Sequence, residues 1–200
     1  MTPQLHQSHQ HQNANAMNIN NYVIEKYSTP IQASNIQPVT VDQMKEYMNI
    51  TSEFQDTLIT ELIVQATRSI EKLTGLCLVP STVVALIDNS GGDIELPLGP
   101  YVKEISIADK QGNNVSNYTL SGLQFKTLSE PRQDYLVCTY KAGYTRTTFE
   151  NFPLLPEELY GCIKDQVSFL FENRGENGSL GYSEKVYRTV RKYTRHPLFI

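Results

Sequence analysis

The chain has 200 residues, and at a typical domain size of roughly 150 residues this length allows one domain with extensions or two small domains. Its 17 Lys and Arg residues and 21 Asp and Glu residues give a formal net charge of −4, which excludes a protein that is basic over its whole surface. It contains no run of about 18 apolar residues and no basic-then-apolar N-terminal stretch, so we predict neither a membrane span nor a signal peptide.

Residues 1–39 are predicted to be a polar, flexible N-terminal arm. The segment is rich in Gln, Asn, His, Ser and Thr and carries two charges, Glu25 and Lys26. Such a composition buries too little apolar surface to offset the entropy that is lost on ordering. The apolar patch at residues 22–31 is the exception, and it is suited to adding a strand to a neighbouring molecule.

Two helices, which together form a helical hairpin, are predicted between residues 40 and 75. Thr40 and Gln43 have the spacing of a capping box and begin a short helix that ends near residue 48. Ser52 begins a long helix that runs to residue 74 and is stopped by Gly75. Apolar side chains recur on one side of the long helix: Phe54, Leu58, Ile59, Leu62, Ile63, Ala66, Ile70 and Leu73.

Residues 76–150 have the shorter period of strands and are interrupted by turn-forming residues. The predicted strands are 81–87, 92–96, 102–108, 124–128 and 135–141, with turns at 89–92 and 109–113. Pro97 and Pro100 mark a break or an edge strand. We therefore predict one small antiparallel sheet.

Residues 156–173 are predicted to form a closing C-terminal helix. Pro156, Glu157 and Glu158 suit its first turn. Apolar residues cover more than half of its circumference, which favours packing on two sides, one of them against another subunit. The candidate subunit-contact residues are Leu159, Ile163, Phe169 and Phe171.

Residues 175–200 are predicted to be a glycine-rich linker and a basic C-terminal tail. Five basic and two acidic residues give this segment a net charge of +3, whereas 11 basic and 18 acidic residues give residues 40–174 a net charge of −7. Cations between tyrosines suit an acidic protein surface, a nucleic-acid backbone, or docking on the acidic domain of the same chain or of a neighbour. The candidate partner-binding residues are Tyr182, Lys185, Tyr187, Arg188, Arg191, Lys192 and Arg195.

No motif for catalysis or cofactor binding is present. A histidine-based catalytic site would need a terminal segment to fold back on the core, because all four histidines lie near the ends, at His6, His9, His11 and His196. The three cysteines have no CxxC spacing, lie in apolar surroundings and are typical of core residues: Cys77, Cys138 and Cys162. The glycine-rich stretches lack the spacing of a phosphate-binding loop. We predict no enzyme activity, no cofactor and no metal site, and we interpret the N-terminal histidines as part of a polar arm.

Several short stretches, taken in their order, resemble one protein family. They are residues 39–48 (VTVDQMKEYM), 69–75 (SIEKLTG), 94–102 (IELPLGPYV), 139–144 (TYKAGY), 155–159 (LPEEL) and 171–174 (FENR). Together they resemble the phage head-tail connector proteins, also called head completion or adaptor proteins. The resemblance covers about residues 39–176.

The resemblance implies an α+β domain at residues 40–174, between extended polar tails at 1–39 and 175–200. It implies a structural virion protein that is made in the host cytoplasm and located in the neck, at the head-tail interface. There it is expected to form a ring of twelve copies, to dock on the portal protein, to contact the tail or further neck proteins, and to help retain and pass the packaged DNA. An acidic domain suits a channel that DNA crosses without binding. The alternative is a soluble DNA-binding factor that uses the basic C-terminal tail.

Overall fold

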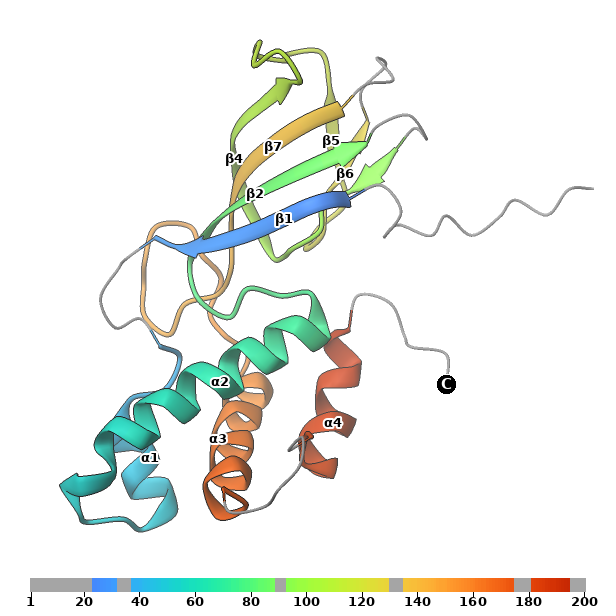
Figure 1. The fold of residues 1–200 in the computed structure, drawn as a ribbon. Coiled ribbons are helices and arrows are strands. Elements are labelled where there is room, and N and C mark those ends of the chain that lie inside the picture. The colour runs from blue at the N-terminus through green and yellow to red at the C-terminus, as the bar shows by residue number, and fades with distance from the viewer. Residues whose placement is uncertain (1–22, 32–36, 89–92, 130–134, 175–180, 195–200) are drawn as a thin grey trace, which may run out of the picture.

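A layer of helices lies against a layer of two antiparallel sheets (Figure 1). This computed structural model describes residues 23–31, 37–88, 93–129, 135–174 and 181–194. The arrangement is an α+β fold, as the sequence predicts. None of the helices in these ranges is both long and apolar enough to cross a membrane.

The helical layer of the described ranges contains four α-helices and two 3-10 turns. They are α1 (Val41–Met48), η2 (Glu53–Gln55), α2 (Asp56–Thr74), α3 (Glu157–Glu172), α4 (Glu184–Val190) and η4 (Arg191–Tyr193). In Figure 1, α2 crosses the layer next to the sheets, and α3 lies between α1 and α4. Buried side chains from all four α-helices meet in one apolar core, together with Val39, Leu78 and Tyr144.

Three of the predicted helix ends are confirmed, and two of them have capping contacts. The Thr40 hydroxyl accepts the Gln43 N–H at 3.2 Å, and the Gln43 side chain accepts the Thr40 N–H at 3.0 Å. Gly75 ends α2 in the left-handed conformation, with φ of 72°. Pro156 directly precedes the first residue of α3.

The start of the long helix differs from the prediction. Ser52 caps a separate 3-10 turn by accepting the Phe54 N–H at 3.3 Å, and α2 begins only at Asp56. Because Phe54 lies before the regular helix, the helical period does not apply to it, and its side chain is 101% exposed instead of joining the apolar face. Thr67 is buried and donates its hydroxyl to the Ile63 carbonyl.

Within the described ranges seven strands form two sheets, where the sequence predicted one. The larger sheet has the order β1 (Val23–Pro30), β2 (Ser81–Asp88), β7 (Tyr135–Ala142) and β4 (Tyr101–Asp109), all antiparallel. The smaller sheet has the order β3 (Ile94–Glu95), β6 (Thr127–Ser129) and β5 (Thr119–Ser121). In Figure 1 the smaller sheet lies behind the larger one. A second apolar core forms with buried residues of both sheets, among them Val83, Cys138, Tyr140, Ile94 and Leu128.

The division into two sheets follows from the short segment between β3 and β4. Pro97 and Pro100 cannot donate a backbone hydrogen bond, so strand pairing stops there, and β3 pairs with β6 instead of extending the larger sheet. The strand β5 has only three residues and was not predicted. The predicted turn at 109–113 is confirmed, because the Asp109 side chain accepts the N–H groups of Gln111 and Asn113; the one at 89–92 lies outside the described residues.

The predicted terminal tails contain ordered elements of the domain. Residues 22–31 were expected to add a strand to a neighbour, but β1 pairs with β2 of the same chain, with Tyr27 opposite Val84. The remaining arm, residues 1–22, lies outside the described ranges. In the C-terminal segment, Val186 and Val190 of α4 are buried in the helical core. Their spacing of four residues places both on one side of a helix.

Candidate assembly surfaces

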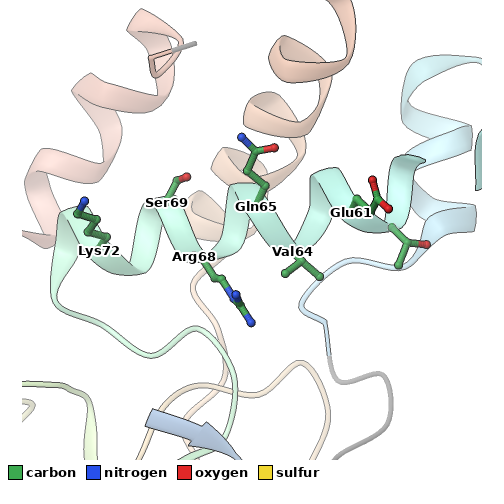
Figure 2. Close-up of a pocket in the computed structure, with 7 residues that line it drawn as sticks. Glu61, Val64, Gln65, Arg68, Ser69 and Lys72 are labelled. Carbon is green, nitrogen blue, oxygen red and sulfur yellow. The ribbon is translucent and has the colours of Figure 1, made fainter. Parts of the chain in front are cut away.

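The outer side of α2 forms a shallow groove with a volume of about 550 Å³ (Figure 2). The groove is lined by Thr60, Glu61, Val64, Gln65, Arg68, Ser69 and Lys72. In Figure 2, Val64 and Arg68 point toward the sheets, whereas Gln65 and Ser69 point the other way. A surface made by one helix has no facing wall to enclose a small molecule. It is suited instead to contact with another protein chain.

A second groove, of about 420 Å³, lies where the helical layer meets the sheet layer. It is lined by side chains from residues 37–43, 78–79 and 144–149. Beside it, the Arg146 guanidinium bonds Glu157 at 2.6 Å and lies 3.9 Å from the centre of the Tyr160 ring. The Lys164 ammonium lies over the same ring at 4.5 Å and over the Tyr47 ring at 4.9 Å. These cation–π contacts connect the loop after β7 with α3 and α1.

The larger sheet has an uncovered outer face. Side chains on this face alternate with those that enter the core between the sheets. Its apolar residues include Tyr27, Val84, Leu86, Tyr135 and Val137, of which Tyr27 is 55% and Tyr135 43% exposed. No described segment lies over this face in Figure 1. Four strands of about eight residues cover about 500 Å², and polar side chains such as Thr82, Thr139 and Lys141 lie among the apolar ones on this face.

The candidate partner-binding residues lie on α4 and η4, apart from Tyr182 just before them and Arg195, which is outside the described residues. Tyr182 donates its hydroxyl to the Ser69 carbonyl at 3.0 Å and thereby fixes the start of α4 to α2. Lys185 bonds Asp165 of α3 at 2.9 Å, and this contact raises the pKa of the lysine.

The remaining cations of α4 and η4 have different surroundings. Lys192 lies 3.5 Å from Glu158, whose carboxylate also accepts the Tyr193 hydroxyl at 2.9 Å. Arg188 bonds Glu184 at 2.7 Å, and both side chains are largely exposed. Arg191 lies 6.0 Å from the centre of the Tyr187 ring. The basic segment therefore docks partly on the acidic residues of its own chain.

The candidate subunit-contact residues on α3 separate into two pairs. Leu159 and Ile163 are completely buried among helices of the same chain, which removes their side chains from any interface between subunits. Phe169 and Phe171 are partly exposed. A role for these two in subunit contact stays a prediction.

The buried titratable groups have pKa values that reflect their burial. Burial raises the pKa of the Cys77 and Cys162 thiols and that of Cys138 to about 12, so the three thiols are protonated at neutral pH. Burial also raises the pKa of Glu71 to about 7, although its carboxylate accepts the Leu78 N–H at 2.7 Å. Among the described residues, no three His, Cys, Asp or Glu side chains are grouped closely enough to hold a metal ion.

Neither the outer sheet face nor the α2 groove was predicted from the sequence. A signal for the sheet face was present in β2, which reads STVVALID and is apolar on both alternating sides. A strand that is apolar on both sides is typical of a sheet that is covered on both faces. The α2 groove gives no such signal, because polar residues on the outer side of a helix are ordinary.

Comparison with known proteins gives a family and a fold. The family model described as phage gp6-like head-tail connector protein matches residues 38–136. The fold is similar to that of chains in three solved structures of gene transfer agent (GTA) particles: the neck of the empty particle computed with C6 symmetry (TM-score 0.64), the virion of the native particle (0.62) and the neck of the native particle computed with C12 symmetry (0.62).

Each structural match covers 84% of this chain at 13% sequence identity, and it covers 95% of the first solved chain and 94% of the other two. No curated protein sequence matches the chain significantly. At this level of identity, the solved structures indicate a shared fold.

Proposed function

The chain belongs to the phage gp6-like head-tail connector family, and from this premise we propose that copies of it form a closed ring in the neck of a phage-like particle. The chain is a structural connector and not an enzyme. The observation that carries the proposal is the family match over residues 38–136, which includes α1, α2 and the strands from β2 to β6.

The similar solved chains support the ring. Two of them come from necks that were computed with C6 and C12 symmetry, which fits the expected twelve copies. In a closed ring each copy contacts its two neighbours through two different surfaces. The outer face of the larger sheet and the α2 groove are two surfaces suited to contact with other chains of the neck, since no described segment covers the first and a single helix forms the second.

In this ring the chain docks on the portal protein, helps to retain the packaged DNA and provides the platform for tail attachment. Residues 40–174 carry a net charge of −7. A channel lined by such a domain repels DNA phosphates, so the genome passes without being held. This supports a role as a conduit rather than as a DNA-binding protein.

Particles made without the chain test the proposal. We expect heads that lack tails and lose their DNA, and expression of the wild-type chain from a plasmid should restore both features. The measurements are electron microscopy for tails and nuclease protection for DNA. Tailed, DNA-filled particles in the absence of the chain would overturn the proposal.

The alternative of a soluble DNA-binding factor depends on the cations of α4 and η4. Three of these already bond carboxylates of the same chain. A gel-shift titration between 50 and 200 mM salt separates the two functions, because several phosphate contacts would give strong binding at low salt that falls steeply over about this range. We expect no DNA binding at either end of the range.

A further inference from the structure

The helical layer carries opposite charges on its two sides. We define the acidic flank as residues 40–61, which form α1, η2 and the start of α2, and the basic flank as residues 181–194, which form α4 and η4. The acidic flank has five acidic residues and one basic residue, a net charge of −4; the basic flank has four basic residues and one acidic residue, a net charge of +3. α1 and α4 lie on opposite sides of α3 (Figure 1).

Most acidic residues of the acidic flank have no ion-pair partner among the described residues. Lys45, its one cation, bonds Asp56 at 2.9 Å. Within the described ranges, no cation forms a salt bridge with the other four acidic residues, which are all exposed: Asp42, Glu46, Glu53 and Glu61. The flank therefore offers several carboxylates to a basic partner.

An aromatic side chain lies within the acidic flank. Phe54 follows Glu53 in the 3-10 turn, and its ring is completely exposed. Tyr47, at the end of α1, is 44% exposed. Exposed aromatic side chains surrounded by polar groups are typical anchors of protein interfaces, because their burial against a partner releases much apolar surface from water.

The basic flank is fixed to the domain by its apolar side and presents its cations outward. Val186 and Val190 are fully buried, whereas Arg188 and Arg191 are exposed. No described carboxylate forms a salt bridge with Arg191, and the bond between Arg188 and Glu184 joins two exposed side chains. Such exposed pairs contribute little to stability, so Arg188 is available to a carboxylate of another chain.

We infer that, in the ring of the proposed function, the acidic flank of one copy binds the basic flank of the next copy. The partner is a second copy because one chain carries both complementary surfaces on opposite sides. A contact between two different surfaces of identical chains runs head to tail, and repeated around an axis it closes a ring. Phe54 lies within this contact, against the helix that presents Arg188 and Arg191.

Charge reversal on each flank tests the contact. Variant A carries Glu46→Lys and Glu53→Lys, and variant B carries Arg188→Glu and Arg191→Glu. Each is produced in cells that assemble particles without the wild-type chain, and the amount of chain per portal protein is measured in purified particles by quantitative mass spectrometry. The matched control carries Asp93→Lys, Gln111→Lys and Asn114→Lys, which make the same change in charge as variant A at exposed positions of the sheet layer.

Variants A and B alone should each fall to below about one tenth of the wild-type amount, since at the substituted positions every contact in a uniform ring would place like charges opposite each other and one exposed ion pair alone is worth up to about fivefold in an equilibrium constant. Expressed together, A and B should recover at least about half of the wild-type amount in equal proportions. At the same positions, every contact in an alternating ring of an even number of copies again places opposite charges together. The control should be present in the wild-type amount. Variants A and B should melt at the wild-type temperature when followed by circular dichroism.

Three other results would contradict the account at different levels. Wild-type amounts of A or B alone would overturn the flank contact and leave the neck location intact. Loss of both variants without recovery in the mixture would mean that the basic flank binds the portal protein or DNA, which also overturns the inference. Absence of the wild-type chain from particles would overturn the proposed function itself.

Discussion

Glu71, near the end of α2, is expected to make the stability of the chain depend on pH. Burial raises the pKa of its carboxyl from 4.5 to about 7, with Arg68 acting in the opposite direction. The folded chain therefore holds this proton more tightly than the unfolded chain. The free energy of unfolding should fall as pH rises from about 4.5 to about 7 and then level off. A pKa shift of this size lowers the free energy of unfolding by at most about 3 kcal/mol between these pH values.

The substitution Glu71→Gln removes the charge and keeps an oxygen that can accept the Leu78 N–H. We expect the variant to be more stable than the wild type by about 1–3 kcal/mol at pH 8 and nearly equal to it at pH 5. Urea denaturation at both pH values measures the difference.

Glu61→Gln is the matched control for Glu71→Gln, because Glu61 is exposed on the same helix. It should change the free energy of unfolding by no more than about 0.5 kcal/mol at either pH. The reasoning is refuted if Glu71→Gln and the wild type lose stability equally between pH 5 and pH 8.

Three further substitutions test the fold. Gly143→Ala should lower the free energy of unfolding by more than about 2 kcal/mol, because Gly143 has φ of +130° and an added Cβ would overlap the Val79 carbonyl oxygen; a thermal melt within two degrees of the wild type would speak against this packing. Val186→Ala removes two methyl groups from a fully buried position and should lower the free energy of unfolding by about 2 kcal/mol. Trypsin should then cleave α4 faster than in the wild type. Unchanged cleavage would show that this contact does not fix α4 to the domain. Thr40→Ala should lower the free energy of unfolding by about 1 kcal/mol through loss of the capping box, as measured by urea denaturation. Thr40→Ser should retain most of the wild-type stability. Equal stability of the wild type and both variants would contradict a stabilising cap.

Local signals in the sequence predicted the elements whose cause is local. The capping box at Thr40, the stop at Gly75 and the alternation of β2 and β7 each depend on residues close in sequence, and all three are present in the structure. Residues 22–31 were expected to add a strand to a neighbouring molecule, and the pairing of β1 within the chain was missed. Only its pairing with the distant β2 makes it a strand.

Other features were hidden by stronger signals in the same segment. The helix α4 has seven residues, and its two buried valines are outnumbered by charged and polar residues, so composition indicated a tail. Phe54 is exposed because it lies in a 3-10 turn before α2. The periodic pattern of apolar residues does not distinguish such a turn from the start of the α-helix. The charge difference between the ends of the chain was visible in the sequence, but only the fold places the acidic and basic segments on opposite sides of α3 (Figure 1).

A reconstruction of the neck in purified particles, without imposed symmetry, tests the closed ring most directly. We expect a ring of twelve copies of this fold between the portal protein and the tail, with α1 of each copy beside α4 of its neighbour. A neck in which this position is occupied by another protein, or in which single copies of the chain lie apart from one another, would contradict a connector that works as a ring.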